Sequence, residues 1–236
     1  MDRLKMKRIL LKLSGEFLQG NNSVWDENKV KGIVDQIVRL AEEKFQIGIV
    51  IGGGNIFRGG KNGFDLDRCE ADEIGMAATC VNALFLKACL KKAGLQVSVC
   101  GAFLHGSAVD VFDVETVRKD LDKGNIVIFS GGTGHAYFST DTAAALRALE
   151  IKADVLLKAT KVDGVYDKDP VEFLDAKKFS KLTYQQACEG KYAVMDACAF
   201  ALCQEQKMPI FIFNLNAENA IYKAAHQQLD GTFIEE

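Results

Sequence analysis

The sequence predicts an α/β protein: a three-layer α/β/α sandwich with a mostly parallel central sheet, formed by a single domain over residues 1–236. Apolar segments of strand length alternate with helical patterns from end to end. The strand segments are apolar at consecutive positions, as expected where helices cover both faces of a parallel sheet. A chain of 236 residues buries enough surface to fold without disulfides or a structural metal.

In the N-terminal half, short apolar runs that stop at glycine or polar residues predict strands. The first helix is expected where Val30, Ile33, Val34 and Ile37 recur at helical spacing. The expected strands are at 9–13, 47–51, 96–101 and 126–130. The expected helices between them are at about 27–44, 71–93 and 114–122.

The C-terminal half continues the alternation with one interruption. Residues 162–176 are dense in turn-forming residues, and Asp163-Gly164 is a hairpin signal, so this segment is expected to protrude as a hairpin or loop. The other expected elements are helices at 140–149, 184–188, 194–206 and about 217–228, with strands at 155–158 and 210–213.

Composition excludes several classes of function. The chain has 29 Lys and Arg against 32 Asp and Glu, so it lacks the basic excess of a nucleic-acid-binding protein. Its longest apolar runs fall short of the roughly 20 residues of a membrane span, and its N-terminus is expected to be a strand instead of a signal peptide. Seven cysteines without paired zinc-site spacing indicate reduced thiols. We expect a cytoplasmic protein with neither nucleic acid nor membrane as partner.

Three expected strands end in glycine-rich segments: Lys12-Leu13-Ser14-Gly15, Ile51-Gly52-Gly53-Gly54-Asn55 and Ser130-Gly131-Gly132-Thr133-Gly134. The carboxyl ends of parallel strands share one rim, where ligands bind. Glycines allow backbone N–H groups to approach an anion there. Any one of these segments can be a simple tight turn, but three together favour a ligand with several phosphates.

Basic residues lie beside these segments. Lys12 and Lys158 stand inside or at the end of apolar strands, and Arg58 follows the triple glycine. A lysine in a buried strand is costly unless it is paired or bound to an anion, although a strand-end lysine can also extend its ammonium to solvent. Asp141 opens the next helix, where its carboxylate can cap the helix, hold these lysines, or do both.

The common nucleotide motifs are absent. Neither GxxxxGK[ST] nor GxGxxG occurs, which argues against a P-loop and a Rossmann dinucleotide site. The three histidines, His105, His135 and His226, are too scattered for a metal site. No metal-binding residues are therefore predicted.

Five ordered motifs carry a resemblance to a known family: KRILLKLSGE at 7–16, VIGGGNIFRG at 50–59, residues 130–145, KATKVDGVYDKDP at 158–170 and VMDACAFALCQEQKMPIFIFN at 194–214. Together they resemble the bacterial uridylate kinase family of the amino-acid kinase superfamily, over almost the whole chain. The resemblance implies transfer of the γ-phosphoryl group of ATP to UMP, giving UDP and ADP in pyrimidine nucleotide biosynthesis. It also implies Mg²⁺ accompanying ATP, inhibition by UTP in the UMP pocket, and a homohexamer.

The resemblance also implies a role for each matching residue. Lys12, Lys158, Arg58 and Asp141 would be catalytic. ATP would bind at Lys12, Leu13, Ser14, Gly15, Gly54, Arg58, Thr160, Tyr166 and Asp169. UMP would bind at Gly53, Asp72, Thr133, Gly134, His135, Ala136, Tyr137, Phe138, Ser139 and Thr140. Asp196, in the VMD motif, ranks below these.

The chain departs from the family pattern at two places. His135-Ala136 stands where the family usually has Asn-Pro. Asn22-Ser23-Val24-Trp25 replaces the Gly-Phe-Gly element of members activated by GTP, and Lys87 and Ser98 stand where arginines of the effector site are expected. We therefore expect weak or absent activation by GTP. Two other functions stay open: another small-acid kinase of the superfamily, or a non-catalytic nucleotide-binding or oxyanion-storage protein.

Overall fold

A computed structural model describes residues 6–58, 65–102, 106–170, 172–192 and 195–236. Its centre is a nine-stranded sheet in the order β4-β3-β5-β2-β1-β6-β10-β11-β9, and all neighbours are parallel except β10 and β11. The strands are β1 Arg8–Leu13, β2 Gln46–Ile51, β3 Val97–Gly101, β4 Asp110–Val111, β5 Ile126–Ser130, β6 Val155–Thr160, β9 Lys181–Thr183, β10 Ile210–Asn214 and β11 Thr232–Glu235.

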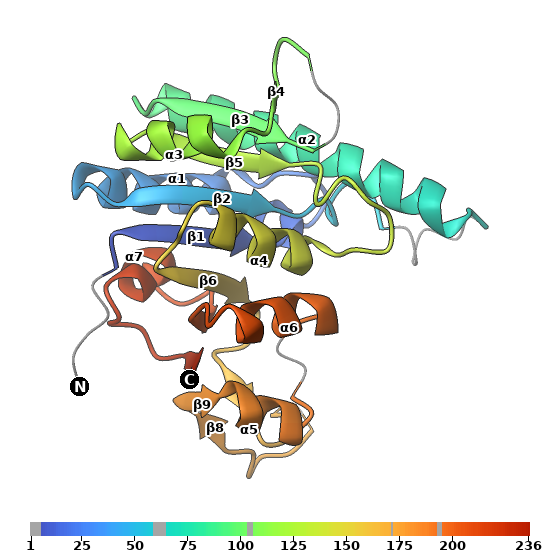
Figure 1. Cartoon of the computed structure of the whole chain (residues 1–236), viewed down its shortest axis with the longest axis vertical. Helices are drawn as coiled ribbons and strands as arrows, with labels where there is room; N and C mark the ends of the chain where they lie inside the picture. The colour runs from blue at the N-terminus through green and yellow to red at the C-terminus, as the bar shows by residue number, and fades with distance from the viewer. Residues whose placement is uncertain (1–5, 59–64, 103–105, 171, 193–194) are drawn as a thin grey trace.

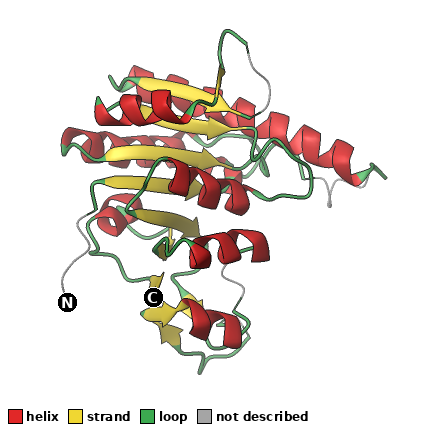
Figure 2. Cartoon of the chain, in the orientation of Figure 1, coloured by secondary structure: helices red, strands yellow, loops and turns green. Residues whose placement is uncertain are grey.

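Helices cover both faces of this sheet (Figures 1 and 2). Helices α1 (Glu27–Glu42), α2 (Arg68–Lys92) and α7 (Ala220–Ala225) pack in one apolar cluster, and α3 (Val114–Asp122), α4 (Thr140–Glu150), α5 (Tyr184–Glu189) and α6 (Ala197–Glu205) pack in the other. Strand residues alternate between the clusters, with Ile9 and Leu11 in the first and Leu10 in the second. The predicted three-layer sandwich is confirmed.

Capping side chains explain where several helices begin. The 71–93 helix starts earlier than predicted, at Arg68, because the Asp67 carboxylate accepts a hydrogen bond from Cys69 N. The 194–206 helix starts at Ala197, where Asp196 accepts from Ala199 N. Such caps satisfy backbone N–H groups that have no partner within the helix. The helix at 114–122 and the strand at 126–130 have their predicted bounds.

The predicted helix at 217–228 is wrong in extent, because α7 covers only Ala220–Ala225. Asn219 has a left-handed backbone with φ 53°, which interrupts a helix, and Ala217 N bonds to Asn214 O in a turn. Gln227 is again left-handed, with φ 54°, and ends the helix. The strand β11 that follows was not predicted.

The protruding hairpin is confirmed, but its expected turn is wrong. Strands β7 (Val165–Tyr166) and β8 (Lys178–Phe179) pair antiparallel, and residues 167–177 connect them, closed by Asp167 N bonding to Lys177 O. Asp163-Gly164 precedes β7. Gly164 has φ 154°, and a Cβ there would lie 2.6 Å from Thr232 Oγ1, so it is the close approach to β11 that calls for glycine.

Helix α2 bears on the expectation that no segment of the chain crosses a membrane. In the described part of the chain it is one helix whose length and composition would suffice to cross a bilayer. Much of this helix is buried within the protein, and the fully buried Asn82 bonds to Gly52 O at 2.7 Å. The core helix of a globular protein can have the same length and composition as a membrane span.

All seven cysteines are free thiols.

Candidate active site

The carboxyl ends of β5, β2, β1 and β6 lie next to one another in the sheet and bring the three glycine-rich segments to one rim. In Figure 1 the arrowheads of these strands point to this rim. Residues 14–15 follow β1, residues 52–54 follow β2 and residues 131–134 follow β5. The prediction of a shared rim is confirmed.

Asp141 joins the two lysines that the sequence places in strands. Lys12 and Lys158 are paired across β1 and β6, and both side chains are only 12% exposed. Lys12 Nζ lies 2.7 Å from Asp141 Oδ1, and Lys158 Nζ lies 2.6 Å from Asp141 Oδ2. Of the open interpretations of Asp141, holding the lysines is therefore realised, while the capping of α4 falls to Ser139.

The charges in this triad set its titration. Burial raises the pKa of Asp141, but the ammonium groups of Lys12 and Lys158 outweigh burial and hold the pKa below its ordinary value. Burial also lowers the pKa of Lys158, and Asp141 opposes that effect. An anion arriving beside the ammonium group of Lys158 would raise the pKa of that group in the same way as Asp141 does.

The lowered pKa of Asp141 predicts a pH-dependent stability. Because the folded pKa lies below the unfolded value of about 3.9, the triad stabilises the protein above that value, and this contribution is lost as the pH falls through the folded pKa. We expect the free energy of unfolding of the wild type to fall more steeply below about pH 4 than that of Asp141→Asn, measured by urea denaturation. Parallel curves would contradict this prediction, since other carboxylates titrate equally in both proteins.

A second set of hydrogen bonds fixes the start of α4. Ser139 Oγ accepts from Asp141 N at 2.9 Å and donates to Asp196 Oδ2. Asp196 also accepts from Thr142 Oγ1 at 2.9 Å and caps α6. Burial raises the pKa of Asp196, but these hydrogen bonds outweigh it and lower the pKa. Asp196 thus holds the helix that presents Asp141, and it is more central than its low sequence ranking indicates.

Buried amides hold the first two glycine segments together. Asn82 Nδ2 donates to Gly52 O at 2.7 Å and to Asn55 Oδ1 at 2.7 Å, and Asn82 Oδ1 accepts from Trp25 Nε1 at 2.9 Å. A Cβ on Gly15 would lie 2.6 Å from Gly52 O and still closer to Asn55 Oδ1. The sequence does not predict Asn55 and Asn82 as site residues, although a polar residue on the apolar face of the 71–93 helix is a usable signal.

Replacing Gly15 by alanine is expected to destabilise this region. The added methyl group meets the Gly52 carbonyl and the Asn55 amide, which are themselves fixed by Asn82. Overpacking of this kind costs about 1–3 kcal/mol, so urea denaturation of Gly15→Ala should show a lower midpoint. Gly32→Ala is the control, because a Cβ there meets nothing within 4 Å and alanine favours the helix. An unchanged midpoint for Gly15→Ala would contradict the packing described.

The residues predicted for UMP come together from two distant segments. Asp72, in the second turn of α2, accepts a hydrogen bond at 2.7 Å from Tyr137 N in the loop after β5. Gly53 lies against α2, where a Cβ would be 2.8 Å from that of Ala78. His135 N bonds to Thr133 Oγ1 within the loop. Residues 133–140, namely Thr133, Gly134, His135, Ala136, Tyr137, Phe138, Ser139 and Thr140, connect β5 to α4 along the rim.

Two aromatic side chains of this loop face solvent. Tyr137 is 67% exposed and Phe138 48% exposed, and Tyr137 has a left-handed backbone with φ 70°. Exposed aromatic rings beside a glycine-rich segment offer surfaces for stacking on a base. Gly131 N, at the start of the segment, donates to the buried Thr79 Oγ1 at 2.7 Å.

Arg58 is brought to the rim by the chain that follows the triple glycine. Its Nε donates to Gly54 O at 2.9 Å, and its guanidinium pairs with Glu16, the residue after Gly15. Lys161 Nζ contacts the other Glu16 oxygen at 2.6 Å. Glu16 and Lys161 are not among the residues that the sequence predicts, although they adjoin Gly15 and Thr160, which are.

The residues predicted for the adenine nucleotide line one cavity of about 460 Å³. Thr160, Tyr166 and Asp169 contribute to its wall together with Ile212 and Tyr192. Thr160 Oγ1 bonds to Val162 N and Phe213 O, which ties the end of β6 to β10. Tyr166 donates to Asp163 Oδ1 at 2.7 Å. Leu13, at the end of β1, is fully buried, and Ser14 caps the short 3-10 helix η1 (Gly15–Leu18).

Metal-ligating side chains are spread over the part of the chain that the structure describes. No group of three or more His, Cys, Asp and Glu side chains is placed to hold a metal within the described ranges. His226 pairs with Glu43 at 2.7 Å, away from the rim, and His105 lies outside the described residues.

Comparisons with known proteins identify the family and the fold of this chain. The model of the amino acid kinase family matches residues 7–214. The structure is similar to a UMP kinase from Ureaplasma parvum, with a TM-score of 0.94, 35% identity, and coverage of 98% of this chain and 100% of that one. A UMP kinase from Bacillus anthracis gives 0.93, 33%, 98% and 96%, and a uridylate kinase from Archaeoglobus fulgidus gives 0.72, 30%, 96% and 99%. The chain belongs to the amino acid kinase family.

Proposed function

We propose that this protein is an ATP-dependent UMP kinase, which transfers the γ-phosphoryl group of ATP to UMP. One observation carries the proposal: Lys12 and Lys158, both largely buried, are held side by side by Asp141 at the rim where three glycine-rich segments meet. The similarity of nearly the whole chain to proteins described as UMP kinases supports UMP as the acceptor.

Lys12, Lys158 and Arg58 would neutralise the charge of the transferred group. Phosphoryl transfer needs an in-line arrangement and charge neutralisation more than covalent help from the protein. The two lysines lie across adjacent strands, so their spacing is fixed by the sheet. Asp141 would be a catalytic residue that orients both ammonium groups. Mg²⁺ bound to ATP would add charge neutralisation at the phosphates.

The two nucleotides would occupy opposite sides of this triad. The ATP phosphates would lie over Lys12, Ser14, Gly15, Gly54 and Arg58, next to Leu13, with the base in the cavity formed by Thr160, Tyr166 and Asp169. UMP would lie between Gly53 and Asp72 on the α2 side and the loop at 133–140. When UMP binds, contacts to the nucleotide would replace the hydrogen bond from Tyr137 N to Asp72.

Release of ADP, measured with each of UMP, CMP and dUMP as acceptor, tests this function. We expect ADP to form with UMP and only weakly with the other two. Glutamate, carbamate and isopentenyl phosphate extend the panel to other acceptors of the superfamily. ATP consumption that does not depend on UMP would overturn the proposal and favour a nucleotide-binding or storage role.

We expect the protein to respond to UTP but not appreciably to GTP. UTP should inhibit, because it shares the base and sugar of UMP and would occupy the same pocket. GTP should change the rate less than about twofold at fixed ATP and UMP, since the Gly-Phe-Gly element is absent and Lys87 and Ser98 replace arginines. Initial rates with and without GTP check this expectation, and a several-fold activation would contradict it.

We propose further that the chain forms one domain and assembles as a homohexamer in the cytoplasm. An apolar groove of about 540 Å³ beside α2 supports an interface there. It is lined by Ile74, Val81 and Ile56, which are 43%, 46% and 38% exposed. Sedimentation equilibrium of the purified protein tests the number of subunits.

A further inference from the structure

Glu16 repeats, at the outer side of the rim, the arrangement that Asp141 makes inside it. Asp141 bridges Lys12 and Lys158, whereas Glu16 bridges Arg58 and Lys161. In each case one carboxylate pairs with two cations from different segments. Asp196 also acts on Lys158, so three carboxylates face four cations here, and this end of the site keeps a net positive charge that suits a polyphosphate.

Backbone hydrogen bonds fix the segments that carry Glu16 and Lys161, while the lysine side chain is mostly exposed. Glu16 lies in η1, where Phe17 N bonds to Ser14 O and Gln19 N bonds to Glu16 O. Lys161 follows Thr160, and the bond from Val162 N to Thr160 Oγ1 closes the turn around it. The side chain of Glu16 is 25% exposed and that of Lys161 is 68% exposed. Lys161 is thus the most exposed side chain of this cluster.

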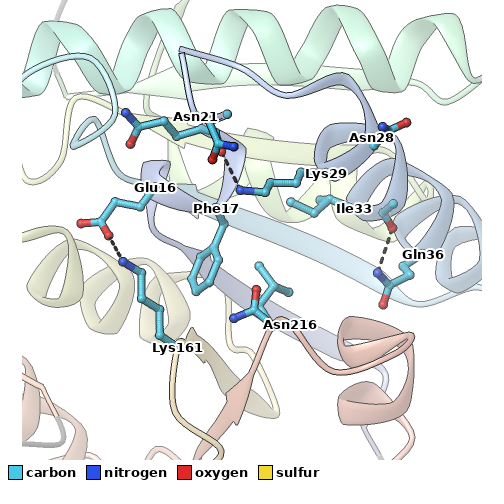
Figure 3. Close-up of a pocket in the computed structure, with 13 residues that line it drawn as sticks. Glu16, Phe17, Asn21, Asn28, Lys29, Ile33, Gln36, Lys161 and Asn216 are labelled. Atoms are coloured by element: carbon cyan, nitrogen blue, oxygen red, sulfur yellow. Dashed lines mark hydrogen bonds and ion pairs between the residues drawn. The ribbon is translucent and has the colours of Figure 1, made fainter. Parts of the chain in front are cut away.

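Figure 3 shows the Glu16–Lys161 ion pair at the wall of a cavity of about 500 Å³. The cavity lies between η1, α1 and the residues after β10, with Phe17, Ile33 and Asn216 in its wall. The lysine therefore borders open space instead of packed side chains. Its neighbour Thr160 lines the separate cavity expected for the adenine nucleotide.

We propose that Lys161 is a further ATP-binding residue, which leaves Glu16 and binds the polyphosphate when ATP enters. This inference rests on the proposed function, because it assumes ATP in the site. An exposed ion pair is worth about 0–1 kcal/mol, so leaving Glu16 costs little. A charge-assisted hydrogen bond to a phosphate oxygen inside the site is stronger. In the absence of ATP, Glu16 thus holds both Arg58 and Lys161 by ion pairs close to the expected position of the phosphates.

Lys161→Met tests the proposal, because methionine keeps much of the length of the side chain and removes its charge. Titration with a non-hydrolysable ATP analogue and Mg²⁺ should show an affinity about tenfold weaker than the wild type, the lower end for a hydrogen bond to a charged group. The KM for ATP should rise in parallel, while the KM for UMP stays within twofold. Lys161→Arg should restore most of the affinity, and added salt should weaken binding less in Lys161→Met than in the wild type.

Lys207→Met is the matched control. Lys207 is also exposed, at 66%, and pairs with Glu236 at 2.9 Å, but it precedes β10 at the opposite end of the sheet. Its loss should leave the affinity for the analogue unchanged. Affinity of Lys161→Met within twofold of the wild type would overturn the proposal. The titration needs no acceptor, so this result is distinct from a failure of the UMP kinase function, which shows as wild-type ADP release that UMP does not stimulate.

Discussion

Lys12→Ala is expected to lower the turnover number by about 10² to 10³, the effect of removing one preorganised charge donor at a reacting group. Lys12 lies in the middle of the sheet between β2 and β6, and its ammonium group is held by Asp141 at 2.7 Å. The strand fixes it where the transferred phosphoryl group would pass. Steady-state rates at saturating ATP and UMP measure the effect.

The fold of Lys12→Ala must be checked independently of its activity. Trp25, the single tryptophan, stacks on Phe85 at 4.0 Å and bonds to Asn82, next to the glycine-rich segments. Its fluorescence should be unchanged in the variant. Turnover within a factor of two of the wild type would rule out the assigned role of Lys12.

Asp141→Asn is expected to impair both catalysis and stability. The amide removes the negative charge that compensates two buried ammonium groups, and breaking a buried ion pair from one side costs about 3–5 kcal/mol. The amide also leaves the lysines without the group that orients them. We expect a turnover number at least about 10²-fold lower, on the scale of lost preorganisation.

Two measurements separate the effects on catalysis and on stability. Urea denaturation gives the loss of folding free energy, and the turnover is measured well below the denaturation midpoint, where the variant is folded. Asp122→Asn serves as the control because Asp122 also pairs with a cation, Arg8, but its side chain is 61% exposed and lies at the end of α3. Asp141→Asn with the stability and turnover of the control would contradict the role of the triad.

The parallel core of the fold follows from local sequence signals. Residues 126–129 are apolar at every position because they contact helices on both faces of the sheet, and the strand at 126–130 could be predicted with its exact bounds. Lys12 and Lys158 could also be predicted as site residues beside the glycine-rich segments, because a cation in a buried strand needs a partner. Asp141 supplies it.

The remaining features depend on long-range contacts that a local pattern does not contain. Strand β11 is short, and it forms because it pairs with β10 and β9. Asn82 becomes a site-building residue only because α2 crosses behind Gly52. Glu16 and Lys161 lie 145 positions apart in the chain and meet because β1 and β6 are neighbours.

Transfer of a ³²P label from the γ-position of ATP tests the proposed phosphorylation of UMP most directly. The protein, Mg²⁺, labelled ATP and UMP are incubated, and the products are separated by chromatography. We expect label in UDP, in amounts equal to the ADP formed, and almost none with Lys12→Ala. Label that appears only in inorganic phosphate, or stays in ATP whether or not UMP is present, would contradict it.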